Sequence, residues 1–104
     1  MNNSGVFIIL FDLPTKTKTQ IKLANRFRKE LKKNGYFMLQ ESVYVKLFHR
    51  ISNIENERFH IKSIVPDEGT VYTLKINLSL FKQMETIVGK EFDFNLFSGD
   101  VVYV

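Results

Sequence analysis

The feature that most constrains the fold is an uninterrupted apolar run, Val-Phe-Ile-Ile-Leu-Phe, at residues 6–11. Six residues are few for a helix, and three of the six are β-branched, so the run predicts a buried central strand. Asp12 and Leu13 follow, and Pro14 ends the strand because proline cannot donate a hydrogen bond to a neighbouring strand. Other elements are therefore expected to pair with this strand and to cover it.

A basic amphipathic helix is predicted directly after this strand. Thr17 and Gln20 have the spacing of a capping box, which marks the helix start, and Gly35 marks its end after about Asn34. The apolar residues of the segment repeat at helical spacing and are expected to face the core. They are Ile21, Leu23, Ala24, Phe27 and Leu31.

The later elements alternate between strands and helices. Residues 36–48 predict one strand with a bend or bulge near residues 40–42, because a segment this long exceeds the usual strand length. The remaining predicted elements are a helix over residues 51–65, a turn at residues 66–69, a strand at Thr70–Asn77, a short helix capped by Ser79 and ending near Val88 before Gly89, and a terminal strand at residues 101–104.

This order of elements predicts an α+β fold, and a ferredoxin-like βαββαβ-type sheet is the simplest small architecture that fits it. No linker or repeat divides the chain, so a single domain is expected over residues 1–104, with a core at about 5–88 and a C-terminal segment at 89–104. The apolar terminal strand needs an edge to pair with, which either its own sheet or a second protomer of a homodimer could supply.

Composition excludes several kinds of site. The 104 residues contain no cysteine, which rules out disulfides, thiolate zinc sites and cysteine nucleophiles. His49 and His60 lack a third ligand at a recognisable spacing, and Ser42 lacks a paired base nearby in the sequence. No apolar run approaches the roughly 18 residues of a membrane helix, and residues 1–5 lack a secretory-signal pattern, so we expect a cytoplasmic protein.

Positive charge is concentrated in one segment. The chain has a net charge of +4, but residues 16–33 alone carry +7, because one acid, Glu30, stands among eight basic residues. These are Lys16, Lys18, Lys22, Arg26, Arg28, Lys29, Lys32 and Lys33. Like charges one turn apart destabilise a helix unless an outside anion compensates, so we expect nucleic acid to bind here with steep salt dependence. The ordinary alternative is a solvated lysine face.

Asp12 is the second candidate functional residue. It follows a buried strand, and ligands commonly bind at strand ends in sheets of this kind. A carboxylate there could hold Mg²⁺ together with waters and a substrate phosphate. One carboxylate is a poor metal site, but two-fold symmetry would supply a second if Asp12 lies near a dimer axis. The alternative is that Asp12 forms a turn or caps the next helix.

Several short motifs carry a family resemblance. They are Phe-Asp-Leu-Pro-Thr at residues 11–15 before the basic helix, Gly-Tyr-Phe-Met at 35–38, Gln-Glu-Ser-Val-Tyr at 40–44 and Pro-Asp-Glu-Gly at 66–69 before the third strand. In this order, over about residues 5–104, the chain resembles the small CRISPR-associated adaptation proteins, the Cas Two family, and most of all its members from systems with a single effector nuclease. These are the ferredoxin-like partners of the CRISPR integrase in spacer acquisition.

The resemblance implies a homodimer whose terminal strand crosses to the partner protomer, and which bridges two integrase dimers with duplex protospacer DNA across the basic surface. It also implies a Mg²⁺-dependent endonuclease, an activity commonly assigned to the family as an endoribonuclease. The family's metal-binding aspartate matches Asp12, with one ion shared by Asp12 of both protomers, and its serine matches Ser42. Glu41 stands where the family often has an aromatic or apolar residue.

Three functions follow as hypotheses. The leading one is a DNA-binding scaffold in CRISPR adaptation, with a mainly structural role. The alternative is a metal-dependent endonuclease or endoribonuclease acting on its own, as a toxin-like ribonuclease of the same fold would. The third is a small-molecule regulatory domain, which the basic helix disfavours because such a domain needs no salt-sensitive binding to nucleic acid.

Overall fold

The computed structural model describes residues 3–97 of the chain as four strands, three α-helices and two short 3₁₀ turns. In chain order the elements are β1 (Gly5–Asp12), α1 (Lys18–Lys33), β2 (Phe37–Gln40), β3 (Val43–Phe48), a 3₁₀ turn (Ile51–Asn53), α2 (Ile54–Ile64), β4 (Thr70–Asn77), α3 (Leu78–Phe81) and a 3₁₀ turn (Phe94–Phe97).

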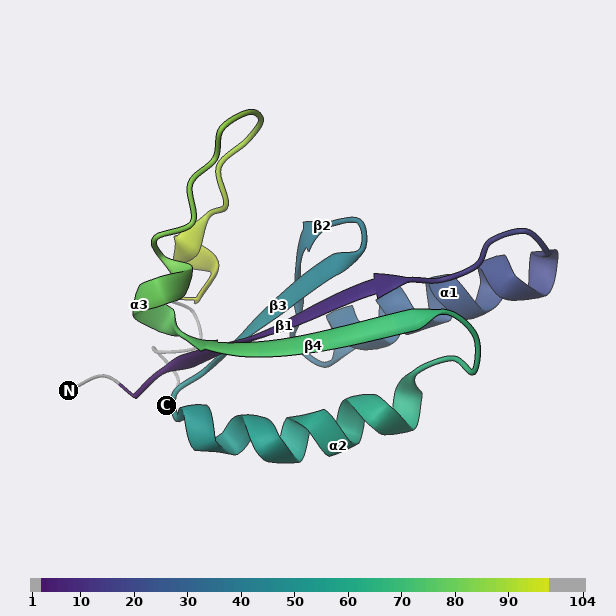
Figure 1. Cartoon of the computed structure of the whole chain (residues 1–104), viewed down its shortest axis with the longest axis horizontal. Coiled ribbons are helices and arrows are strands. Elements are labelled where there is room, and N and C mark those ends of the chain that lie inside the picture. Colours follow the sequence, from purple (N-terminus) through teal and green to yellow (C-terminus); the bar gives the residue numbers. More distant parts are fainter. Residues whose placement is uncertain (1–2, 98–104) are drawn as a thin grey trace.

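The four strands form one antiparallel sheet in the order β2-β3-β1-β4, with β1 paired to both β3 and β4 (Figure 1). The apolar run is therefore the central strand, as predicted. The helices α1 and α2 pack on one face of the sheet, so the expected α+β, ferredoxin-like fold is confirmed. The predicted terminal strand at residues 101–104 lies outside the described residues.

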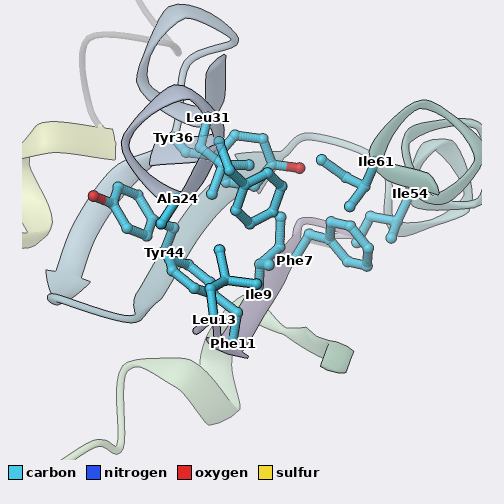
Figure 2. Packing of buried hydrophobic residues seen from close by; sticks show 11 residues of the cluster. Phe7, Ile9, Phe11, Leu13, Ala24, Leu31, Tyr36, Tyr44, Ile54 and Ile61 are labelled. Carbon is cyan, nitrogen blue, oxygen red and sulfur yellow. The ribbon is translucent and has the colours of Figure 1, made fainter. Parts of the chain in front are cut away.

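The central strand is apolar throughout because it contributes to two cores. Phe7, Ile9 and Phe11 point toward α1 and α2 and belong to the larger cluster shown in Figure 2. Val6 and Ile8 point to the opposite face, where α3 and the segment around Phe92–Phe97 cover part of the sheet. Alternate side chains of a strand face opposite sides, so burial on both faces removes the polar alternation of a surface strand.

The predicted single strand over residues 36–48 is wrong. Residues 37–48 form a hairpin in which β2 pairs with β3, and Glu41 and Ser42 are the turn between Gln40 and Val43. The pairing is irregular between Met38 and Gln40. A two-residue turn leaves the alternation of apolar residues almost in phase, so the sequence pattern does not separate a bent strand from two paired ones.

The predicted helix from Ser79 to Val88 is also wrong in its bounds. The cap is Asn77, whose Oδ1 accepts a hydrogen bond from the main-chain N–H of Leu80 at 2.8 Å, and α3 ends at Phe81. The Ser79 hydroxyl donates to Asn77 Oδ1 instead. Asn is a strong N-cap, so the helix begins two residues earlier than predicted. The chain beyond α3 extends away from the sheet as a loop (Figure 1).

Candidate functional site

The start of α1 is fixed by a full capping box. The main-chain N–H of Gln20 donates to Thr17 Oγ1, and the main-chain N–H of Thr17 donates to Gln20 Oε1, each over 3.1 Å. Gln20 Oε1 also accepts from the main-chain N–H of Lys16, and its amide donates to Glu68 Oε2 at 3.3 Å. These bonds satisfy N–H groups that a helix start leaves open, and they tie the first turn of the basic helix to the turn before β4.

Seven of the eight basic side chains of this segment are exposed: Lys16, Lys18, Lys22, Arg26, Lys29, Lys32 and Lys33. Within residues 3–97 none of the seven forms a salt bridge, whereas the ion pairs that do form involve Lys46, Arg58 and Lys75. The helix therefore presents a row of uncompensated positive charge on its outer side. We call these seven residues the basic track.

The core-facing side of α1 is narrower than predicted. Ala24, Phe27 and Leu31 are buried, but the predicted core residue Ile21 has 44% of its surface exposed. At 100° per residue Ile21 lies about 90° from the centre of the buried face. It lines a shallow depression together with residues of the basic track, among them Lys18, Lys22 and Lys29.

Arg28 differs from the basic track. It is half-buried on the same flank of α1 as Ile21, and its guanidinium carbon lies 5.5 Å from the centre of the Phe11 ring. Its Nε donates to the main-chain carbonyl of Glu41 at 3.3 Å. Sequence reasoning placed Arg28 with the nucleic-acid-binding residues, and only the folded hairpin brings Glu41 within its reach.

Asp12 ends β1, where it pairs with Thr70 of β4, and its side chain is exposed. It shares the alternation of Ile8 and Leu10, so it belongs to the sheet face opposite α1 and α2. In the described part of the chain its carboxylate has no hydrogen bond or ion pair. The helix cap is Thr17, so the alternative role of Asp12 as the cap of α1 is excluded.

The structure brings the turn that carries Ser42 next to the end of β1. The main-chain N–H of Phe11 donates to the carbonyl of Ser42 at 3.0 Å, which continues the pairing of Leu10 with Val43 by one residue. Ser42 is half-buried, and no histidine or carboxylate hydrogen-bonds to it within residues 3–97. Its main chain therefore shapes the site, while its hydroxyl lacks the base that a nucleophile requires.

The metal-binding capacity of one protomer is small. Between residues 3 and 97 no three His, Asp or Glu side chains lie close enough together to hold a metal ion. Asp12 offers one exposed carboxylate at the end of the sheet, unpaired within residues 3–97. Its oxygens are suitable ligands for Mg²⁺, but one carboxylate is an incomplete set. The donor set therefore fits the predicted ion only if a second protomer adds its own carboxylate.

Apolar surface surrounds Asp12 on the open face of the sheet. Tyr72 and Leu74 of β4 are 67% and 51% exposed, and both share the alternation of Asp12 across the β1–β4 pairing. A groove of about 800 Å³ runs between this face and the loop after α3, lined by Leu10, Leu74 and Ile87 among others. Tyr72 and Leu74 alternate along β4 and so lie on one side of the strand, but the sequence did not reveal that this side is uncovered.

A second polar cluster was not predicted from the sequence. The buried Tyr36 donates its hydroxyl to Glu57 Oε2 at 2.6 Å, and Lys46 Nζ lies 3.8 Å from the same oxygen. Burial, followed by the hydrogen bond to Glu57, raises the pKa of Tyr36 well above its usual range. The three groups join β3 to α2 and stabilise the scaffold on which α1 rests.

No helix in the described residues is both long and apolar enough to cross a membrane.

Comparison with known proteins identifies the family. The family model of CRISPR associated protein Cas2 matches residues 6–84. The CRISPR-associated endoribonuclease Cas2 of Campylobacter jejuni subsp. jejuni is 42% identical over 82 residues, which are 79% of this chain and 57% of that protein. The namesake of Parvibaculum lavamentivorans is 39% identical over 87 residues, covering 81% of this chain and 83% of that protein.

The namesake of Flavobacterium psychrophilum is 33% identical over 84 residues, covering 81% of this chain and 73% of that protein. The chain thus spans little more than half of its Campylobacter relative but most of the other two. The matched region contains β1 with Asp12, the whole of α1 and the hairpin turn at Ser42. The resemblance predicted from the short motifs is confirmed, and the chain belongs to the CRISPR-associated Cas2 family.

Proposed function

We propose that this chain is a homodimeric scaffold of CRISPR adaptation, which binds duplex protospacer DNA along α1 and bridges two integrase dimers during spacer acquisition. The observation that carries the proposal is the basic track. Seven exposed cations on and beside one helix have no acidic partner within residues 3–97, and a phosphate backbone is the ligand that compensates such a row.

The proposed contact is to phosphates and does not read bases. The track is dominated by lysines that reach outward from a helix lying flat on the sheet, and lysine neutralises phosphate as a point charge. Specificity for sequence would need side chains inserted into a groove, and the outer side of α1 offers mainly charge. A scaffold that measures or holds DNA of any sequence suits this chemistry.

The homodimer is supported by the open face of the sheet. Tyr72, diagonally across from Asp12, and Leu74, further along β4, are exposed on the same face, and a second copy would cover this apolar surface. A two-fold axis near Asp12 would also bring the carboxylates of both protomers together, which is the arrangement that a shared Mg²⁺ requires.

The experiment is the salt dependence of duplex binding. We expect the logarithm of the association constant to fall linearly with the logarithm of salt concentration, with a slope of about −0.9 for each phosphate contact. Substituting Lys18, Lys22 and Lys29 by Gln should flatten the slope by about 2 to 3 units. Lys82→Gln, at the end of α3, removes one positive charge away from α1 and should leave the slope unchanged. A flat salt response of the wild type would refute duplex binding by this helix.

A metal-dependent endonuclease or endoribonuclease is the second candidate, because the named relatives are endoribonucleases and Asp12 is an unpaired carboxylate at a strand end. When bound, Mg²⁺ would supply Lewis-acid chemistry at a phosphodiester. Asp12 of each protomer would hold the ion, and the basic track would orient the nucleic acid. Cleavage must disappear in Asp12→Asn with the fold retained; cleavage that survives points to another site or a contaminant.

A further inference from the structure

Arg28 is half-buried and contacts other elements, unlike the seven exposed residues of the basic track. Its Nε is bonded to the Glu41 carbonyl at 3.3 Å, and its guanidinium lies over the Phe11 ring at 5.5 Å. The Phe11 ring is itself held by Phe27, edge-on at 5.1 Å, and by Tyr44, stacked at 5.7 Å. The guanidinium therefore packs on a ring whose position the core already fixes.

The charge of Arg28 also has an acid nearby. The Arg28 Nε is bonded to the main chain of Glu41, so the carboxylate belongs to the residue that Arg28 contacts. Burial raises the pKa of Tyr44, and the Arg28 and Glu41 charges act on that pKa in opposite directions. A phosphate approaching Arg28 would meet the repulsion of the Glu41 carboxylate. Like the residues of the basic track, Arg28 forms no salt bridge within residues 3–97; what distinguishes it is its contacts with Glu41 and Phe11.

The contacts of Arg28 join three segments at one end of the sheet. Arg28 belongs to α1, Phe11 to the end of β1 and Glu41 to the turn between β2 and β3. The main-chain N–H of Phe11 also donates to the carbonyl of Ser42 at 3.0 Å, which bonds the end of β1 directly to this turn. Asp12 is the next residue after Phe11, so these contacts hold the end of β1 that presents the Asp12 carboxylate.

We propose that Arg28 is a positioning residue: it clamps the Glu41–Ser42 turn against the end of β1, thereby fixes where the Asp12 carboxylate lies, and takes no part in phosphate binding. The statement about Asp12 rests on the proposed function of that residue as a metal ligand. The clamp itself is supported by the contacts of Arg28 with Glu41 and Phe11, whatever the role of Asp12.

Arginine suits this role better than lysine. A planar guanidinium can stack on Phe11 and donate in its own plane to the Glu41 carbonyl at the same time. A lysine ammonium keeps the charge but lacks the plane and the Nε donor. Arg28→Lys therefore separates the geometry of the clamp from its charge, and it is mild enough to keep the fold.

Two readouts in the full chain test the proposal. The first is the hydrogen-exchange rate of the Phe11 amide, measured relative to amides at the other end of β1, and the second is the salt slope of duplex binding. Arg28→Gln and Arg28→Lys should both speed Phe11 exchange several-fold to tenfold and leave the salt slope unchanged. Lys32→Gln, one turn further along the same flank, and Lys22→Gln should flatten the slope by about 0.9 each and leave Phe11 exchange unchanged.

A third readout reaches Asp12. Titration with Mg²⁺, followed through the NMR signal of the Asp12 main-chain N–H, should give a several-fold weaker affinity in both Arg28 variants. Arg28→Lys should not restore the wild-type Mg²⁺ affinity, although it keeps the positive charge. An unchanged hydrogen-exchange rate of the Phe11 amide in Arg28→Gln would refute the clamp. A salt slope flattened by about 0.9 in the same variant would show that Arg28 contacts a phosphate. Absence of Mg²⁺ binding in the wild type would refute the metal role of Asp12, while the first two readouts still decide the role of Arg28.

Discussion

The main-chain N–H of Phe11 donates a hydrogen bond to the carbonyl oxygen of Ser42, with the nitrogen and oxygen 3.0 Å apart. This bond joins two segments that are about thirty residues apart in the sequence and that carry the two candidate site residues, Asp12 and Ser42. It prolongs the antiparallel pairing of β1 and β3 to the very end of β1. The candidate site is thus built by the sheet and does not depend on a long loop.

Tyr36→Phe should destabilise the protein. The hydroxyl of Tyr36 is buried and donates to Glu57 at 2.6 Å, and a hydrogen bond to a charged group contributes roughly 1.5–3 kcal/mol. Its removal leaves the half-buried Glu57 with the more distant Lys46 as its remaining partner. Urea denaturation should show a lower midpoint with an unchanged m-value.

Tyr44→Phe should stabilise the protein or leave its free energy of unfolding unchanged. Tyr44 is fully buried, and its hydroxyl has no hydrogen-bond partner among the described residues. In Figure 2 the hydroxyls of Tyr36 and Tyr44 point in opposite directions. Removing an unpaired buried hydroxyl is expected to raise the free energy of unfolding by up to about 1 kcal/mol. A loss comparable to that of Tyr36→Phe would show that the Tyr44 hydroxyl is hydrogen-bonded in solution.

Thr17→Ala should lower the stability of the protein by about 1 kcal/mol, because it removes the side-chain oxygen that accepts from the main-chain N–H of Gln20. Thr19→Ala is the matched control, since Thr19 is exposed inside the first turn and alanine is the better helix former there. Thermal unfolding of the two variants should therefore shift in opposite directions. Equal shifts would contradict the capping role of Thr17.

Gly69→Ala should be more destabilising than Gly89→Ala. Both glycines have positive φ, +97° and +105°, so both substitutions carry the cost of a left-handed backbone. A Cβ at residue 69 would also lie 2.7 Å from the Asp12 carbonyl oxygen, whereas a Cβ at residue 89 would meet no atom of the described residues within 4 Å. We expect the difference to be about 1–3 kcal/mol, and we expect NMR shifts around Asp12 to change only in Gly69→Ala.

The ion pair of Glu55 should make stability depend on pH. A hydrogen bond from Lys75 at 2.7 Å, and then the Arg58 charge, lower the pKa of Glu55. Because the pKa in the folded state is lowered, the contribution is present above the unfolded-state pKa and is lost as pH falls through the folded-state pKa. The stability difference between the wild type and Glu55→Gln should therefore shrink on acidification. In a Lys75→Met background the same comparison should vary less with pH.

The elements most regular in sequence were predicted well. The apolar run, the capping box of Thr17 and Gln20, and the strand Thr70–Asn77 appear where the sequence places them, because each is set by local chemistry or by burial on a fixed period. The hairpin at Glu41 and Ser42 was not predicted, because the apolar pattern continues through the turn. The start of α3 was misplaced because Asn77, and not Ser79, is its N-cap.

The candidate site was predictable residue by residue but not in its geometry. Composition alone picks out the basic helix, and the place of Asp12 after an apolar strand marks it as a candidate. The sequence does not show that Arg28 turns inward to Glu41 while its neighbour Lys29 stays exposed, because that depends on a hairpin folded from residues far along the chain. It also does not show that Tyr72 is left uncovered beside Asp12.

Spacer acquisition in cells that carry the cognate integrase tests the scaffold role most directly. The wild type is compared with Asp12→Ala and with the triple substitution of Lys18, Lys22 and Lys29 by Gln, while pull-down of the integrase confirms that each complex assembles. We expect acquisition to persist in Asp12→Ala and to be lost in the triple variant, because the scaffold needs the basic track and not the carboxylate. Acquisition lost from an intact Asp12→Ala complex would contradict a purely structural role and would put the metal-dependent nuclease first.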